Sequence, residues 1–247
     1  MASFSALDMV HLWEVGRRQH PLEQALTILE VACPEIARST LSALTIGQRD
    51  TLIFQLREQT LGERLDALVE CPQCHERLEF SMPSVDLRNR PEARQSDPVY
   101  ECDDFETGMK MTFRLPDSRD LAVASGNGTP EAARAMLVER CVIEASLDGT
   151  RVSAHELPDT AITMLAERMA ECDPVADILL NLDCPACHAE WQQPFDIVSF
   201  FWSEITVQAK RLLREVHTLA HAYGWREVDI LSMSTTRRNY YLEMISG

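Results

Sequence analysis

Two short cysteine motifs of the same form constrain this chain more than any other feature. Each is a C-P-x-C pair, Cys71–Cys74 and Cys184–Cys187, and 109 residues separate the two pairs. A C-x-x-C turn points both sulfurs the same way, so two such turns can surround one ion with Zn–S bonds of about 2.3 Å and leave no coordination position open. The sequence therefore predicts about one structural zinc per chain, bound by all four cysteines.

Other uses of cysteine pairs remain open at this point. A thioredoxin-like redox motif also reads C-x-x-C, but it begins a helix within a βαβ unit, whereas both pairs here follow one strand-like segment and precede another. With His75 and His188 each motif also matches the c-type haem attachment pattern, which requires export. We expect no export signal, because Met1–Ser5 contains no basic region followed by an apolar stretch. Either histidine could replace a thiolate, and two unrelated reduced pairs are the last alternative.

Both motifs are flanked by alternating apolar residues. Leu65, Ala67 and Val69 occupy alternate positions before the first motif, and Leu78 and Phe80 alternate after it. This period of two predicts a strand on each side, with the cysteines at the tip of a hairpin. When the numbering is shifted by 113, the order helix, strand, C-P-x-C-H, strand recurs around the second motif. We therefore predict a degenerate internal duplication, in which each unit donates half of the metal site.

Helices are predicted before and between the hairpins. Pro21 suits a first helical turn, and Thr45 with Gln48 forms a capping box for a helix that stops near Gly62. Later in the chain, Thr129-Pro130 opens a helix that we expect to run through about residue 146.

The remaining elements are a central strand and a helical tail. Residues 109–115 alternate as a strand, and apolar residues at helical spacing predict a long helix over 197–222. Trp225 begins a short helix, and Ser234 caps the last one.

The predicted fold class is α+β and mainly helical. It consists of two duplicated helix–strand–CxxC–strand units joined by the shared four-cysteine zinc site, with a C-terminal helical hairpin. The predicted zinc-bridged body covers 1–196 and the tail covers 197–247. Within the body the predicted ranges are unit one 21–88, a central insertion 89–150 and unit two 151–196.

Charge argues against nucleic acid as a partner. The chain has 23 basic and 39 acidic residues, a net charge of −16. Residues 205–247 carry six basic and four acidic side chains, which leaves 17 basic and 35 acidic ones in 1–204. Phosphate backbones are bound by clustered Lys and Arg, and the motifs are instead flanked by acidic residues. A zinc-ribbon nucleic-acid-binding or transcription accessory protein is therefore the alternative function and not the first.

Catalytic motifs are missing from the sequence. It contains no G-x-x-x-x-G-K-[ST], G-x-G-x-x-G, H-E-x-x-H or G-x-S-x-G pattern. His217 and His221 share a helix face and could bind a metal together, but two solvated polar positions explain them as well. We expect no enzyme activity, no small-molecule substrate and no membrane span, since no apolar run is long enough to cross a bilayer.

Aromatic residues near the C-terminus are the candidate partner surface. Three consecutive large side chains cannot all lie on one narrow helical stripe, so at least one should face a partner or a neighbouring domain. Tyrosine and tryptophan in the tail are residue types that anchor interfaces. The candidate partner-binding residues are Phe200, Phe201, Trp202, Tyr223, Trp225, Tyr240 and Tyr241.

Five motifs together resemble a known family. They are Glu70-Cys71-Pro72-Gln73-Cys74, Phe113-Arg114-Leu115-Pro116-Asp117-Ser118-Arg119-Asp120-Leu121, Asp183-Cys184-Pro185-Ala186-Cys187, Ala222-Tyr223-Gly224-Trp225 and Arg237-Arg238-Asn239-Tyr240-Tyr241-Leu242. The combination resembles the T4-type baseplate hub proteins and assembly chaperones of contractile phage tails, and their relatives in phage-like contractile injection systems.

The resemblance implies a non-enzymatic structural or assembly protein. Its partners would be the baseplate hub, the spike or other baseplate subunits. Its location would be the bacterial cytoplasm or an assembled phage tail-like particle. Zinc would then hold the two units at a fixed angle and present their helical surfaces as one docking face.

Overall fold

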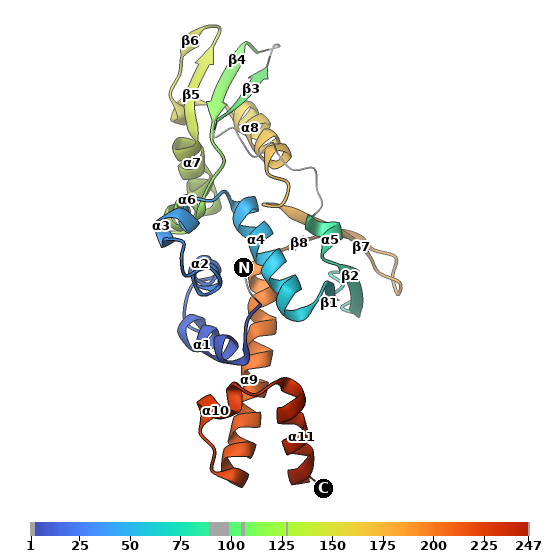
Figure 1. Ribbon diagram of the computed structural model, residues 1–247. Helices are drawn as coiled ribbons and strands as arrows, with labels where there is room; N and C mark the ends of the chain where they lie inside the picture. The colour runs from blue at the N-terminus through green and yellow to red at the C-terminus, as the bar shows by residue number, and fades with distance from the viewer. Residues whose placement is uncertain (1–2, 89–98, 105–106, 127, 247) are drawn as a thin grey trace.

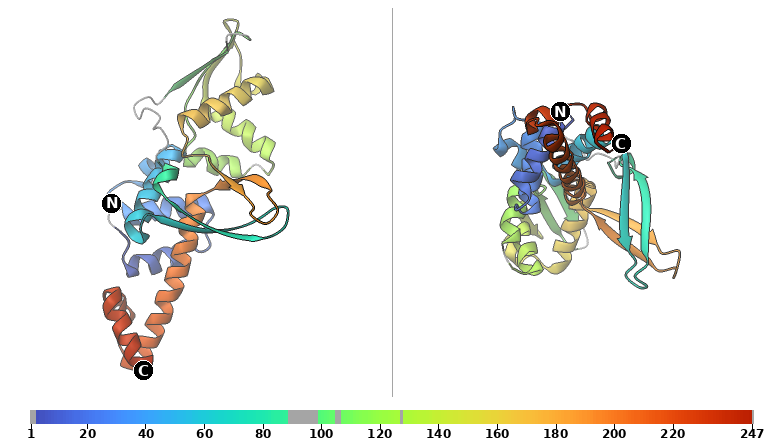
Figure 2. Two further views of the ribbon diagram at one scale, coloured as in Figure 1. Left: turned by 90° about the vertical axis from the view of Figure 1, so that its right-hand side faces the viewer. Right: turned by 90° about the horizontal axis from the view of Figure 1, so that it is seen from below.

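The computed structural model describes residues 3–88, 99–104, 107–126 and 128–246. The fold is α+β, as predicted, and elongated. A small sheet lies at one end, helices from the N-terminal part form the middle, and the C-terminal helices form the other end (Figure 1). Two β-hairpins project sideways from the middle (Figure 2). Among the described residues, no helix combines the length and the apolar composition that crossing a bilayer requires.

The N-terminal helices pack with the long C-terminal helix in the first hydrophobic core. Apolar residues from both regions, including Leu12, Leu29, Phe54 and Phe201, are fully buried there. Thr45 accepts from the backbone N–H of Gln48, so the predicted capping box is confirmed. The helices of this part are α1 (Ala6–Gly16), α2 (Pro21–Ala32), α3 (Arg38–Ser42), α4 (Ile46–Leu61) and, after the first hairpin, α5 (Val85–Arg88).

Each cysteine motif lies at the tip of a two-stranded antiparallel hairpin, as the alternation predicted. The first hairpin pairs β1 (Arg64–Glu70) with β2 (Arg77–Pro83), and the second pairs β7 (Ile178–Asp183) with β8 (Glu190–Phe195). Leu65, Ile178 and Leu180 bury the bases of the hairpins in the first core. The apolar residues nearer the tips are half-buried or exposed, although Phe80 and Leu182 still pack against this core.

The chain between the two hairpins forms the four-stranded antiparallel sheet at the end of the molecule, with the order β3-β4-β5-β6. Helices α7 and α8 pack against one face of it in a second hydrophobic core, around Met109, Met111 and Phe113. The elements here are β3 (Tyr100–Asp104), β4 (Met109–Phe113), α6 (Ser118–Ser125), α7 (Pro130–Cys141), β5 (Val142–Leu147), β6 (Thr150–Arg151), the 3-10 turn η1 (Ala154–Glu156) and α8 (Asp159–Cys172).

The predicted helix through residue 146 is wrong in its second part. Thr129 caps α7 as expected, but the helix ends at Cys141 and the chain continues directly as strand β5. The reason is tertiary pairing, because β5 lies between β4 and β6 in the sheet and its branched residues Val142 and Ile143 favour a strand.

The C-terminal helices form the predicted hairpin. Helix α9 (Ile197–Tyr223) ends at Gly224, whose φ of +68° gives the left-handed cap that glycine favours. Helices α10 (Glu227–Leu231) and α11 (Thr235–Ser246) then fold back along the end of α9 (Figure 1). Arg238 of α11 is buried and donates to Glu215 of α9 over 3.0 Å, which fastens the two helices.

The boundaries of several elements keep the shift of 113 seen in the sequence. Adding 113 to the start of α4 gives the start of α8, and adding it to the start of β2 gives the start of β8. The two helices nevertheless belong to different cores, since α4 contributes to the first and α8 to the second. Part of the predicted central insertion, residues 89–98, lies outside the described residues. The duplication and the predicted domain boundaries therefore stay predictions.

Candidate metal centre

The two hairpin tips meet, and all four predicted cysteines come together there. One sulfur atom from each of Cys71, Cys74, Cys184 and Cys187 lies within 4.8 Å of the others. The shortest contacts join the two hairpins, with 3.6 Å from the Cys71 Sγ to the Cys187 Sγ and 3.6 Å from the Cys74 Sγ to the Cys184 Sγ. The residues that the sequence places 110 and 116 positions apart therefore form one cluster.

The sulfur separations fit one tetrahedral ion. With Zn–S bonds of about 2.3 Å, the edges of a thiolate tetrahedron are about 3.8 Å long. A disulfide requires about 2.05 Å between sulfurs, and all eight cysteines are free. The donor set of four thiol sulfurs is the one that structural zinc sites use, and it leaves no position for substrate. These residues fit a bound zinc.

Both turns have the same backbone geometry. The Cys71 N–H donates to the Glu76 carbonyl over 2.9 Å, and the Cys184 N–H donates to the Ala189 carbonyl over the same distance. The residue after each motif has a positive φ, 61° for His75 and 59° for His188. Non-glycine residues adopt this region infrequently, so its occurrence at both equivalent positions marks a shared turn that aims each cysteine pair.

Backbone N–H groups point at the sulfurs and favour thiolate character. The N–H groups of Cys74 and Gln73 outweigh burial and, with the neighbouring thiols, lower the pKa of Cys71 to about 6. The N–H of Glu76 likewise acts to lower the pKa of Cys74, but the adjacent Cys187 thiol and burial raise it to about 12. Four sulfurs this close cannot all ionise without a cation, so a bound metal ion would allow all four to act as thiolates.

The surroundings do not fit the rival interpretations. Both motifs lie between antiparallel strands, whereas a thioredoxin-like motif begins a helix. Neither histidine belongs to the sulfur cluster. His75 instead contacts Glu70 through a 2.7 Å Nδ1–Oε1 hydrogen bond, and its side chain is 76% exposed. His217 and His221 stack with ring centroids 6.4 Å apart on α9, and no third ligand among the described residues joins them.

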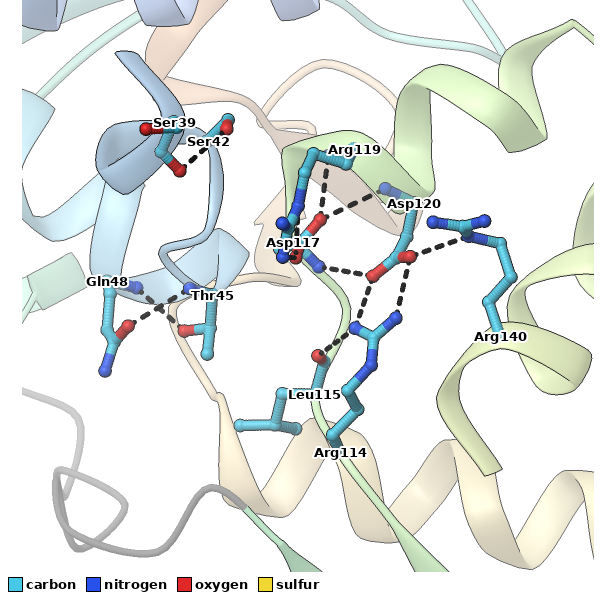
Figure 3. Close-up of polar contacts among 10 residues, drawn as sticks. All are labelled: Ser39, Ser42, Thr45, Gln48, Arg114, Leu115, Asp117, Arg119, Asp120 and Arg140. Atoms are coloured by element: carbon cyan, nitrogen blue, oxygen red, sulfur yellow. Dashed lines mark hydrogen bonds and ion pairs between the residues drawn. The ribbon is translucent and has the colours of Figure 1, made fainter. Parts of the chain in front are cut away.

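A second polar cluster lies where the two cores meet, and no local sequence pattern predicted its burial. Asp120 is fully buried. Its carboxylate accepts hydrogen bonds from Nη1 and Nη2 of Arg114, at 2.5 and 2.9 Å, and from Nε of Arg140 at 2.7 Å (Figure 3). Burial acts to raise the pKa of Asp120, but the hydrogen bonds from Arg114, the Asp117 N–H and Arg140 hold it well below its usual range. We call Arg114, Asp117, Asp120 and Arg140 the junction cluster.

The junction cluster fastens the second core to α4 of the first. Asp117 caps α6 in a capping box with Asp120, and Thr45 at the start of α4 pairs with Asp117 in an isolated β-bridge. The Ile46 N–H donates to the Pro116 carbonyl over 3.2 Å. All charges of the cluster are engaged in this scaffold, which indicates a structural role.

The predicted partner-binding aromatics fall into two groups. In the first, Phe201 is fully buried and stacks on Phe4 at 6.2 Å, and Trp202 packs over Gly16. The ring centroid of Phe200 lies 5.4 Å from that of Phe195. All three aromatics therefore pack against other residues of this chain.

The second group lies on the C-terminal hairpin. Tyr223, Trp225 and Tyr241 form one cluster with centroid distances of 4.4 to 5.7 Å. Tyr240 is 60% exposed. A partner role for any of these residues stays a prediction.

The chain matches a known protein family. A family model described as T4 bacteriophage base plate protein matches residues 18–202, which is 185 of the 247 residues. The matched range contains both cysteine motifs, the central sheet and the junction cluster. Comparisons with curated proteins and with solved structures give no match.

Proposed function

Because the chain belongs to the T4 bacteriophage base plate protein family, we propose that it is a non-enzymatic structural or assembly protein of a contractile-tail baseplate, in a phage-like injection system, stiffened by one structural zinc. The four-sulfur cluster carries this proposal, because it joins two distant hairpins within the matched range and offers no open coordination position.

Zinc would supply the stiffness that the hairpins lack by themselves. A two-stranded hairpin is marginally stable in water, and near both tips the apolar side chains are only half-buried. Structural zinc sites contribute about 10–16 kcal/mol of binding free energy that is coupled to folding. With both tips on one ion, the two hairpins form one rigid projection from the middle of the molecule.

The shared metal also supports the proposed duplication. The two C-P-x-C turns form the same backbone hydrogen bond, and each is followed by a histidine with a positive φ. The starts of a helix and a strand also repeat with a shift of 113. We propose that an ancestral helix–hairpin unit was doubled and that each copy kept two ligands. The division into 1–196 and 197–247 follows the same proposal, with the tail added after the second hairpin.

The tail would provide a further contact surface for other baseplate subunits. Tyr240 and Met244 are 60% and 56% exposed one helical turn apart on α11, and Val228 on α10 is 50% exposed. Exposed aromatic and methionine side chains are enriched at protein interfaces.

Affinity purification from cells that express the whole tail gene cluster tests the proposal. We expect tagged full-length chain to retain hub, spike or other baseplate subunits after washing at physiological ionic strength. A monomer that retains none of these subunits would contradict it. Analysis of finished particles then separates the two roles, since a structural subunit remains in them and an assembly factor is missing.

A further inference from the structure

A groove of about 620 Å³ lies between the two hairpins, next to the metal centre. It follows five consecutive residues of one hairpin, 76–80, and three of the other, 181–183. Successive side chains of a strand point to opposite faces, so a groove that touches every residue in turn reaches the edge of a strand as well as one face. The edges of β2 and β7 therefore border the groove.

The backbone groups that face the groove are unpaired. Cys71 bonds Glu76 and Ser84 bonds Glu63, so even-numbered residues of β2 exchange hydrogen bonds with β1. In an antiparallel ladder the alternate residues turn their N–H and C=O groups away from the partner strand. In β2 these are Arg77 and Glu79.

The same rule applies to β7. Cys184 bonds Ala189, so Asn181 and Asp183 direct their backbone groups away from β8. In the described part of the chain, none of these four outward-facing residues has a backbone partner. All four line the groove, which is thus bordered by two open strand edges.

Side chains give the groove an apolar floor and an acidic rim. Val69 and Leu78 form a cross-strand pair on one face, and Leu182 faces them from β7. The rim carries Glu76, Glu79 and Asp183 against one basic residue, Arg77, and all four are exposed. An occupant that matches both features has apolar side chains on one face and basic side chains on the other.

We propose that the groove binds an extended segment of another protein, which adds as a strand to the free edge of β2 and alternates apolar with basic residues. Strand addition supplies main-chain hydrogen bonds, and the side chains that alternate along the added strand give specificity. The four groove residues of β2, 77–80, correspond to about 13 Å of strand. The C-P-x-C turns close one end of the groove, and a zinc bound by them would hold the edge of β2 in position.

A second copy of this chain fits the groove poorly. Two β2 strands side by side would bring Glu76 and Glu79 of one copy close to the same acidic residues of the other. This proposal rests on the proposed function in one respect, because the protein that carries the added strand would be another baseplate subunit.

The test uses a dye-labelled octapeptide, Val-Lys repeated four times, and fluorescence anisotropy with the full-length chain. We expect saturable binding that is lost when the same residues are arranged as four valines followed by four lysines, or when glutamate replaces lysine. Lack of saturation up to about 1 mM, or equal binding of the blocked peptide, would overturn the proposal.

Two substitutions at position 79 distinguish the contribution of the backbone hydrogen bond to octapeptide binding from that of the side-chain charge. Glu79→Pro removes the outward N–H without touching the β1–β2 ladder, and Glu79→Ala removes only the carboxylate. We expect the proline variant to bind the octapeptide about five- to tenfold more weakly than the alanine variant, because one main-chain hydrogen bond is missing. Equal affinities of the two variants would contradict strand addition at β2.

Amide exchange of the unmodified chain gives a check that needs no variant. Bound octapeptide should slow exchange at Arg77 and Glu79 and leave Leu78, already paired with β1, unchanged. Protection at Asn181 and Asp183 alone would assign the strand to β7 and overturn the proposal.

Purification from tail-expressing cells separates the possible failures. Baseplate subunits that bind Glu79→Pro and Glu79→Ala with equal affinity would contradict the groove and leave the proposed function intact. Octapeptide binding without any retained baseplate subunit would contradict the proposed function alone. A dimer in solution that Glu79→Pro dissociates would show a second copy in the groove and overturn the proposal.

Discussion

The metal centre and the junction cluster both fasten distant parts of the chain, but by different chemistry. At the metal centre the neighbouring strands are largely exposed, and the four sulfurs are the contact that closes it. At the junction Asp117 and Asp120 are buried between two hydrophobic cores and are bound by arginines and backbone N–H groups.

The difference follows from how much apolar surface each place can bury. Burial contributes about 25 cal/mol per Å² of apolar surface, and the half-exposed hairpin tips cover little of it. A bound metal ion would supply the missing stabilisation there. The junction is flanked by two cores, so buried ion pairs are tolerated because several hydrogen bonds offset their desolvation. The metal centre should therefore fail locally, and the junction should fail with the rest of the fold.

The largest expected effect is loss of the metal by Cys71→Ser. We expect no bound zinc and amides in β1, β2, β7 and β8 that exchange orders of magnitude faster, because about 10–16 kcal/mol of binding free energy is lost. The second core should keep its protection. Hydrogen exchange with mass spectrometry and metal analysis measure both.

The control for this variant is Cys102→Ser, a buried cysteine of the second core outside the sulfur cluster. It should keep its zinc and its hairpin protection. Equal loss of protection in the two hairpins and in the second core of Cys71→Ser would show that the effect of the metal centre is not local.

The next effect is a global loss of stability in Asp120→Asn. Removing the carboxylate leaves Arg114 and Arg140 without their counter-charge, and breaking a buried ion pair costs about 3–5 kcal/mol. Both arginines are about one-third exposed, so we expect a cost of about 3 kcal/mol. Urea unfolding at pH 7 measures it. Glu144→Gln, at an exposed pair with Arg151, should change stability by less than about 0.5 kcal/mol.

The Asp120 carboxyl also makes the difference in unfolding free energy between the wild type and Asp120→Asn depend on pH. The pKa of Asp120 is lowered in the folded state, so its contribution is present above the unfolded pKa of about 4 and is lost as the pH falls towards the folded value. The difference between the wild type and Asp120→Asn should stay constant from about pH 5 to 8 and narrow below about pH 4. A gap that widens on acidification would be inconsistent with the ion pairs.

A smaller effect is expected where α4 meets the end of α8. A Cβ on Gly47 would lie 1.7 Å from Asp173 Oδ1, and the Gly47 N–H donates to Asp173 Oδ2 over 2.9 Å. Gly47→Ala should therefore cost about 1–3 kcal/mol in thermal or urea unfolding. Gly126→Ala, whose Cβ would meet only Val123 O at 3.5 Å, should be close to neutral. Equal stability of the two variants would exclude a tight contact between these helices.

Local patterns in the sequence predicted much of this structure. The alternation around both motifs predicted the hairpins, and the Thr45–Gln48 box placed the start of α4. The C-P-x-C spacing identified the four sulfurs, because a knuckle is a short-range turn. Each of these signals lies within a few consecutive residues.

Features that depend on contacts between distant residues were missed. Strand β5 was predicted as part of a helix because its pairing with β4 is not visible within 130–146. Asp120 gave no signal of burial, since a carboxylate beside arginines in sequence usually indicates an exposed surface.

X-ray absorption at the zinc edge, with metal analysis of freshly purified full-length chain, tests the central claim most directly. We predict one zinc per chain with four sulfur ligands at about 2.3 Å and no nitrogen ligand. Freshly purified chain that contains no zinc, or a shell that contains histidine nitrogen, would contradict a four-cysteine metal centre shared by the two hairpins.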